Sequence, residues 1–261
     1  MAKKATNKEK KNIIEVNNLI KKFGDFTAVN DISFHVQEGE IFGILGPNGA
    51  GKTTTLETIE TLQKPTSGTI LVDGIDAKRH PDDIKQRIGV QLQSTSFYPE
   101  LKLTELLKMF AAMYDTEVNP TEMLEKVQLG DKAGSFVNKL SGGQKQRFSI
   151  ATTLVNKPIV IFLDEPTTGL DPQARLNLWQ MIREINNTGV TIVLTTHYME
   201  EAEQLCDRLA IMDSGKIVAT GTPRELIENL LKTGFKKEIV RKDASLEDVF
   251  LHLTGKELRD A

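Results

Sequence analysis

The sequence has almost no cysteine and no long apolar run, and each absence excludes a class of protein. Its single cysteine, Cys206, cannot form an internal disulfide or a cysteine-rich metal site. No segment approaches the roughly 18 apolar residues of a membrane span, and the polar first residues lack a signal-peptide core. We therefore expect a protein of a reducing cytoplasm that reaches a membrane only through a partner.

A strong charge of one sign is also missing. The chain has 33 basic and 36 acidic residues, a net charge of -3 at pH 7. Such a balance gives no global attraction to nucleic acid, and we predict no nucleic-acid partner. Five lysines do lie within the first eleven residues. We interpret residues 1–12 as a solvated, flexible basic tail.

What the sequence does contain is a series of short apolar runs separated by helix signals. Residues 41–45, 159–163 and 190–194 could each form a strand buried on both faces. Asp171 and Pro172 offer an N-cap and a first-turn proline for a helix between two of them. This alternation predicts an α/β layer with a mainly parallel sheet.

Two regions have other patterns. Alternating apolar residues before residue 36, and residues 69–72 before Asp73-Gly74, predict an antiparallel portion near the N-terminus. Residues 96–150 look mostly helical, because Leu103, Leu106 and Leu107 fall on one helix face.

A glycine-rich segment after the first apolar run predicts a phosphate-binding loop. Its Gly-x4-Gly-Lys-Thr pattern needs glycines at Gly46 and Gly51 because backbone amides must turn inward around phosphate oxygens. Lys52 would reach the β and γ phosphates of ATP, and Thr53 would ligate Mg²⁺. The predicted nucleotide contacts are Gly46, Pro47, Asn48, Gly49, Ala50, Gly51, Lys52, Thr53 and Thr54.

A pair of carboxylates ends the second apolar run. Asp164 and Glu165 would lie at the carboxyl end of a buried strand, where open α/β sheets bind ligands. We expect Asp164 to hold Mg²⁺ and Glu165 to act as the general base on water. Alone, Asp-Glu-Pro could equally be a turn that ends a strand. His197 follows the third run and could emerge at the same sheet edge.

Upstream of this pair lies Leu140-Ser141-Gly142-Gly143-Gln144, and with it the sequence resembles the ATP-binding cassette (ABC) family. Ser141 and Gln144 could also be an ordinary capping box. The resemblance implies a P-loop NTPase with a RecA-like, mainly parallel core sheet, an N-terminal antiparallel β subdomain and an inserted α-helical subdomain. It also implies a head-to-tail dimer in which Ser141, Gly142 and Gly143 complete the partner's nucleotide site.

The resemblance assigns further residues. Gln93 would contact the metal and the attacking water, although Gln91 is a near neighbour. Asp171 would link the two sites across the dimer, besides capping its helix. Phe23 would stack on adenine or else belong to the core. His197 would contact the γ-phosphate.

The family order of motifs predicts an ABC ATPase domain over residues 13–221, with its helical subdomain at about 96–150, and a short C-terminal extension over residues 222–261. Only about ninety residues separate Thr53 from Leu140, too few for the coiled-coil arms of DNA-maintenance cassettes. The tail over residues 244–255 resembles that of ABC-2 type multidrug or antibiotic exporter subunits.

We therefore expect an ATPase subunit that powers export of a drug-like, lipid or peptide substrate. It would work at the cytoplasmic face of the cell membrane, through a separate transmembrane permease subunit and as a homodimer or heterodimer. The alternative is a soluble cassette ATPase that regulates a cytoplasmic process without a membrane partner. The helical region 97–113 would either dock the permease or pack internally.

Overall fold

The computed structural model of the chain describes residues 11–91 and 97–235. The chain divides into two compact units, one ending at Leu226 and the other beginning at Ile227. The first unit contains both sheets and all the predicted site residues. Gln93 and the exporter-like tail at residues 244–255 lie outside the described residues, as does most of the predicted tail 1–12.

A six-stranded sheet with the order β10-β9-β3-β8-β7-β6 forms the centre of the first unit. All its neighbours pair in parallel except β9 and β10, which are antiparallel. Every residue of β3, β7 and β8 is buried, because layers of helices and strands cover both faces. The strands are β3 (Ile41–Leu45), β6 (Ile88–Gln91), β7 (Val160–Asp164), β8 (Thr191–Thr196), β9 (Arg208–Asp213) and β10 (Lys216–Gly221).

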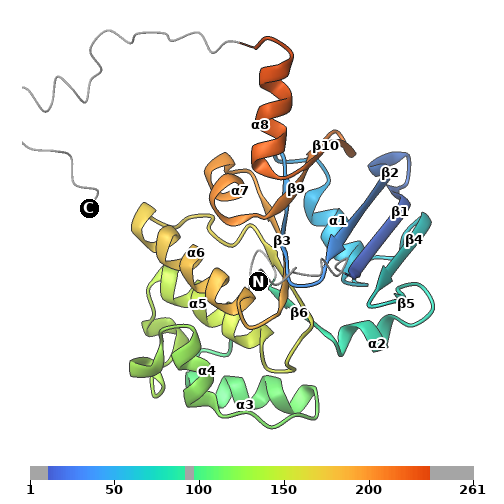
Figure 1. The fold of residues 1–261 in the computed structure, drawn as a ribbon. Coiled ribbons are helices and arrows are strands. Elements are labelled where there is room, and N and C mark those ends of the chain that lie inside the picture. The colour runs from blue at the N-terminus through green and yellow to red at the C-terminus, as the bar shows by residue number, and fades with distance from the viewer. Residues whose placement is uncertain (1–10, 92–96, 236–261) are drawn as a thin grey trace, which may run out of the picture. The chain divides into compact units, whose positions relative to one another are not determined.

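A second sheet, with the order β2-β1-β4-β5, is antiparallel (Figure 1). Its first two strands form a hairpin that turns at Gly24 and Asp25 and pairs Phe23 with Phe26. The ring of Phe34 stacks on that of Phe42 with centroids 5.4 Å apart, which joins the two sheets through a shared apolar core. The strands are β1 (Asn12–Phe23), β2 (Phe26–Gln37), β4 (Ser67–Val72) and β5 (Ile75–Asp76).

Helices follow most strands of the parallel sheet and cover it (Figure 1). The predicted N-cap of α6 is confirmed, because the Asp171 side chain accepts a hydrogen bond from the backbone N–H of Ala174. The helices are α1 (Lys52–Ile59), α2 (Pro81–Lys85), α3 (Leu103–Met113), α4 (Pro120–Lys126), α5 (Gly142–Thr153), α6 (Pro172–Asn186), α7 (Met199–Leu205) and α8 (Pro223–Lys232).

The apolar face of α3 packs internally. Leu103, Leu106 and Leu107 are fully buried in the cluster that also contains Phe148 of α5. Of the two alternatives for the region 97–113, docking or internal packing, these leucines follow the second, and they are not available to a partner. Tyr98 and Met113, at the two ends of the region, remain exposed.

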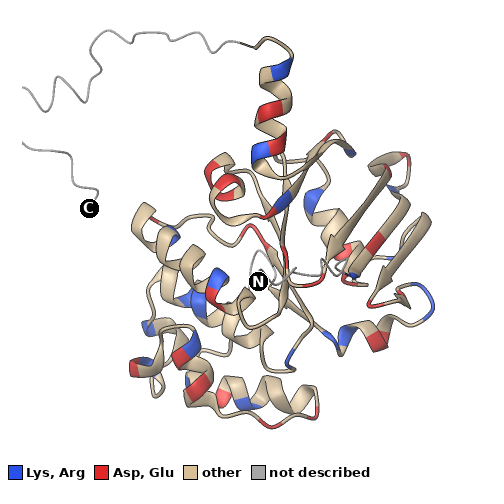
Figure 2. Ribbon diagram, viewed as in Figure 1, with Lys and Arg blue, Asp and Glu red and all other residues tan. Residues whose placement is uncertain are grey.

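The fold class predicted from the sequence is confirmed in its three parts, namely the parallel core sheet, the antiparallel sheet and the inserted helices. Charged residues of both signs lie along the helices, as Figure 2 shows. None of the helices within residues 11–91 and 97–235 combines the length and the apolar character that a bilayer span requires.

Candidate functional site

The predicted phosphate loop connects the end of β3 to the start of α1. Its glycines are required by close approaches of the backbone. A Cβ at Gly46 would lie 2.2 Å from the carbonyl oxygen of Met212. At Gly51, φ is +98° and a Cβ would lie 2.4 Å from the carbonyl oxygen of Ala28. The loop is therefore held tightly against β2 and β9, with its helix N-terminus open to an anion.

Lys52 lies at the bottom of this loop with a side chain that is only 4% exposed. Its Nζ donates hydrogen bonds to the carbonyl oxygens of Gly46, at 2.9 Å, and Pro47, at 3.1 Å. The same Nζ lies 3.2 Å from Oε1 of Glu165. An ammonium has three donors, and these contacts use all of them, so the buried charge is paired.

Thr53 and Asp164 meet at the same edge of the parallel sheet. The Thr53 hydroxyl donates to Asp164, with Oγ1 lying 3.0 Å from Oδ2 and 3.2 Å from Oδ1. The Thr195 hydroxyl, from the neighbouring strand β8, donates to Oδ1 of the same carboxylate. The predicted metal pair, from α1 and β7, is thus adjacent.

This arrangement fits a magnesium ion that arrives with the nucleotide. Mg²⁺ takes oxygen ligands and is held by one or two protein groups together with phosphates and waters. The described residues contain no cluster of three His, Cys, Asp or Glu side chains that could hold a metal without help. One hydroxyl and one carboxylate beside the phosphate loop are the set that a phosphate-bound metal needs.

Glu165 follows Asp164 directly and is the residue on which several contacts converge. Its side chain is 8% exposed, with Oε2 lying 3.2 Å from Nδ1 of His197. The Thr168 hydroxyl donates to Oε2 at 3.2 Å. The backbone of Glu165 has φ +47°, a left-handed conformation that is uncommon for a residue other than glycine.

Burial alone would raise the pKa of the Glu165 carboxyl. Contacts with His197 and Lys52 outweigh burial and hold this pKa below its usual value. The carboxylate is therefore ionised at neutral pH and can orient a water molecule and accept its proton.

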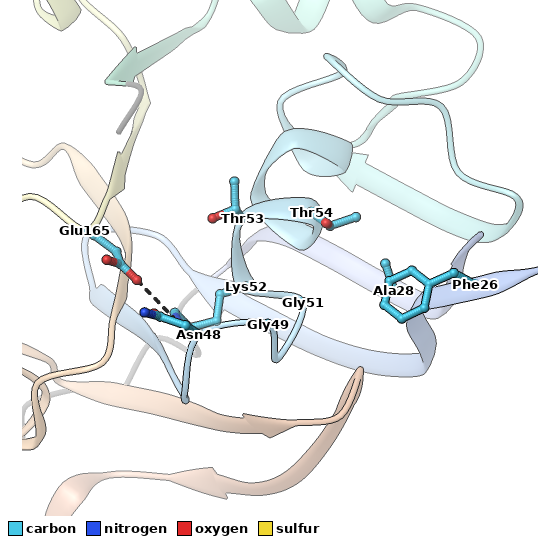
Figure 3. A pocket seen from close by; sticks show the side chains of 9 residues that line it. All are labelled: Phe26, Ala28, Asn48, Gly49, Gly51, Lys52, Thr53, Thr54 and Glu165. Carbon is cyan, nitrogen blue, oxygen red and sulfur yellow. Dashed lines mark ion pairs between the residues drawn. The ribbon is translucent and has the colours of Figure 1, made fainter. Parts of the chain in front are cut away.

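A pocket of about 330 Å³ lies over the phosphate loop, and it holds one aromatic residue that the sequence reasoning missed. Figure 3 shows Phe26 and Ala28 at one end and Glu165 at the other, with the loop between them. Phe23 does not line this pocket: it is 46% exposed, with Nζ of Lys21 lying 4.6 Å from its ring centroid. The missed signal was the two-residue turn, which pairs Phe23 with Phe26 across the hairpin. The pocket is lined by Phe26, Ala28, Asn48, Gly49, Gly51, Lys52, Thr53, Thr54 and Glu165.

A second pocket of about 230 Å³ lies at the start of α5. The predicted capping box is present there, since Gln144 N–H donates to Ser141 Oγ at 3.3 Å and Ser141 N–H donates to Gln144 Oε1 at 2.9 Å. The pocket also takes in Asp171. It shares no lining residue with the first pocket, and is lined by Ser141, Gly142, Gly143, Gln144, Arg147, Gly169, Leu170, Asp171, Ala174 and Asn177.

The predicted residues thus form two groups in the structure. Lys52, Thr53, Asp164, Glu165 and His197 come together at the phosphate loop, from three different segments of the chain. Ser141, Gly142, Gly143 and Asp171 form the separate group at α5.

Comparison with known proteins identifies the family of a chain that contains these two groups of residues. Residues 29–168 match the model of a family described as "ABC transporter". The chain is 37% identical to the Nod factor export ATP-binding protein I of Burkholderia lata, covering 95% of this chain and 98% of that protein. It is 42% identical to the protein of the same name from Ralstonia nicotianae, covering 82% of this chain and 68% of that protein.

Solved structures agree. An ATP-binding subunit of an ABC transporter superimposes with a TM-score of 0.74 at 29% identity, covering 93% of this chain and 99% of that one. A dimeric ATP-binding cassette in a post-hydrolysis state with ADP and phosphate gives a TM-score of 0.71, also at 29% identity, and covers 80% of this chain and 98% of that one. With these matches and the phosphate loop in place, the chain belongs to the ABC transporter family, as an ATP-binding subunit that hydrolyses ATP.

Proposed function

We propose that this subunit powers export through separate membrane subunits, and that it does so as a dimer with two shared nucleotide sites. The observation that carries the proposal is the separation of the two residue groups. One chain contains a phosphate loop with its carboxylates and, elsewhere, a capped glycine helix start that shares no pocket with it. Two chains placed head to tail would complete both sites.

In the proposed site, each residue has a defined task. The loop amides and Lys52 bind the phosphates, and Thr53 and Asp164 hold Mg²⁺, which would supply charge neutralisation on the phosphate oxygens. Glu165 orients and deprotonates water, and His197 contacts the γ-phosphate and keeps the Glu165 carboxylate in place. Gln93, which lies outside the described residues, keeps its proposed role at the metal and the water.

The group at α5 acts on the partner's nucleotide. The N-terminus of α5 carries Ser141 and two glycines, so backbone N–H groups and a positive dipole end face solvent there. The γ-phosphate of the other chain's ATP would bind at this end, and Asp171 would join the two sites. Binding favours the closed dimer, hydrolysis removes that preference, and the motion is passed to the membrane subunit.

The direction of transport is proposed from the relatives, whose names specify export. The substrate is proposed to be drug-like, lipid or peptide. We place the protein at the cytoplasmic face of the cell membrane, and the exposed side chains of Tyr98 and Met113 are proposed to contact the permease.

Affinity purification from detergent-solubilised membranes tests the proposal. A tagged chain is expected to bring down a multi-span membrane protein in a fixed ratio, and exposed-site variants Tyr98→Ala and Met113→Ala are expected to reduce that yield. Recovery of the ATPase alone, with full ATP hydrolysis, would favour the alternative of a soluble regulatory cassette.

A further inference from the structure

A buried carboxylate on α7 has no part in the site described so far. Glu201 is fully buried. Its Oε1 accepts a hydrogen bond from the indole Nε1 of Trp179 on α6 at 2.9 Å. Burial raises the pKa of the Glu201 carboxyl, against the opposing effect of the Thr196, Trp179 and Thr167 side chains and the charge of Arg175. The carboxyl therefore sits among groups from three separate segments.

Two of these groups flank the proposed catalytic pair. Thr196 is the last residue of β8 and directly precedes His197. Its Oγ1 also accepts a hydrogen bond from the backbone N–H of Tyr198 at 2.9 Å, so it fixes the turn that carries the histidine. Thr167 comes two residues after Glu165 and is 1% exposed. The side chains that act on the Glu201 carboxyl thus include one from the segment next to each proposed catalytic residue.

The third segment, α6, connects this cluster to the pocket at α5. The guanidinium of Arg175 lies 4.8 Å from the ring centroid of Tyr198, and that ring lies 4.1 Å from the imidazole of His197. Ala174, the neighbour of Arg175, lines the second pocket, where a Cβ added at Gly143 would lie 3.4 Å from its own Cβ. A displacement of residues at the α5 pocket can therefore be transmitted to His197 through these packed side chains.

Stability alone does not account for this carboxylate. Oε2 of Glu201 and Oγ1 of Thr167 are both buried, and within the described residues neither has a hydrogen bond of full geometry. A buried polar group that is incompletely satisfied lowers the stability of the folded chain.

We propose that Glu201 is a positioning residue that holds the Glu165 loop and the His197 loop in their catalytic arrangement and ties both to α6. The inference rests on the proposed roles of Glu165 and His197. It makes Glu201 a determinant of the rate of hydrolysis rather than of nucleotide affinity, since no Glu201 atom lines the phosphate pocket.

Glu201→Gln tests this, because an amide keeps an acceptor for Trp179 and replaces the ionisable carboxyl. We expect kcat for ATP hydrolysis to fall by about 10- to 100-fold, as misplaced catalytic groups do. The Kd for ATP is measured without Mg²⁺, so that ATP is not hydrolysed. This Kd and the melting temperature are expected to stay close to those of the unaltered protein. The matched control is Glu203→Gln, which removes an exposed carboxylate from the same helix and is expected to leave all three values unchanged.

Trp179 provides a second readout, because it is the only tryptophan in the chain. Its emission is expected to change when nucleotide is added, and this change is expected to be lost in Glu201→Gln. A kcat within about twofold of the unaltered protein, or an equal loss of kcat, affinity and melting temperature, would overturn the positioning role. The outcome for Glu165→Gln separates the two proposals. If that variant is inactive while Glu201→Gln is fully active, the inference alone fails; if Glu165→Gln is fully active, the proposed site fails.

Discussion

The two pockets of this chain differ in how completely each one is built. At the phosphate loop, Lys52 and Asp164 are at most 5% exposed, and each has a partner from another segment. At the start of α5, Ser141 and Gly142 are exposed, and the capping box satisfies only the helix end itself. A site with paired buried charges is pre-organised for chemistry. An exposed helix N-terminus can instead bind an anionic ligand that another molecule presents to it. This contrast favours one chemical half-site and one recognition half-site in each chain.

The strongest test of the chemical half is Glu165→Gln. Loss of the ionised carboxylate is expected to slow ATP hydrolysis by about 10²- to 10⁴-fold while ATP binding is kept, because the amide cannot accept the proton from water. Steady-state hydrolysis and equilibrium binding measure the two effects. A variant with full activity would remove Glu165 from the role of base.

Glu60 is a buried carboxyl near Asp164, and it allows the effect of a buried charge on stability to be measured. Burial and the nearby charges of Asp164 and Glu57 raise the pKa of Glu60 to about 8. The folded chain holds the Glu60 proton more tightly than the unfolded chain does. The contribution of Glu60 to the free energy of unfolding is therefore largest below pH 4.5, and it is lost as pH rises toward 8. The loss is up to about 5 kcal/mol, since one unit of pKa corresponds to about 1.4 kcal/mol.

Glu60→Gln is therefore expected to remove this decline and to be more stable than the unaltered protein at pH 8, as denaturant unfolding between pH 5 and 8 would show. The control Glu184→Gln, on the exposed face of α6, is expected to follow the unaltered protein. Parallel curves for Glu60→Gln and the unaltered protein would contradict the raised pKa.

Lys52→Ala addresses binding rather than chemistry. Loss of the ammonium that is proposed to bind the phosphates is expected to weaken ATP binding by about 100-fold, the effect of removing a charge-assisted contact of 2 to 3 kcal/mol. Titration of ATP by calorimetry measures this. An unchanged Kd would mean that the lysine does not contact the phosphates.

Ser141→Ala tests the recognition half. Loss of the cap is expected to cost about 1 kcal/mol of stability. If the serine also contacts the partner's nucleotide, hydrolysis is expected to fall by about tenfold while ATP binding to the isolated subunit is unchanged, a charge-assisted contact being worth about 1.5 kcal/mol. Thr222→Ala removes the cap of a similar box at α8, distant in sequence from both pockets, and is the matched control. Equal hydrolysis by both variants would leave Ser141 with a capping role only.

The smallest expected effect concerns the aromatic residues. Phe26→Ala is expected to weaken ATP binding by about three- to tenfold, in line with the 1 kcal/mol or so of an aromatic contact, and Phe23→Ala by less. Binding of ATP by each variant decides between them. A larger loss for Phe23→Ala would restore the stacking role that the family resemblance assigns to it.

Much of the fold was predictable because its signals are local. The run at residues 41–45 is β3 as expected, and the strands predicted at 159–163 and 190–194 are β7 and β8 with boundaries shifted by one or two residues. A strand buried on both faces is a nearly continuous apolar run, so the sequence shows most of it directly. The end of such a strand is less visible, because Thr195 and Thr196 are polar but buried by tertiary contacts.

The sequence by itself determined the kinds of groups in this protein: a glycine-rich phosphate loop, a carboxylate pair after a strand, and a capped helix start. Only the tertiary structure decided which of them meet. It pairs Lys52 with Glu165 and Glu165 with His197, puts Phe26 rather than Phe23 on the pocket wall, and buries Glu201 against Trp179. The physical reason is that a backbone pattern depends on neighbouring residues, whereas the pairing of buried charges depends on which strand ends the sheet brings together.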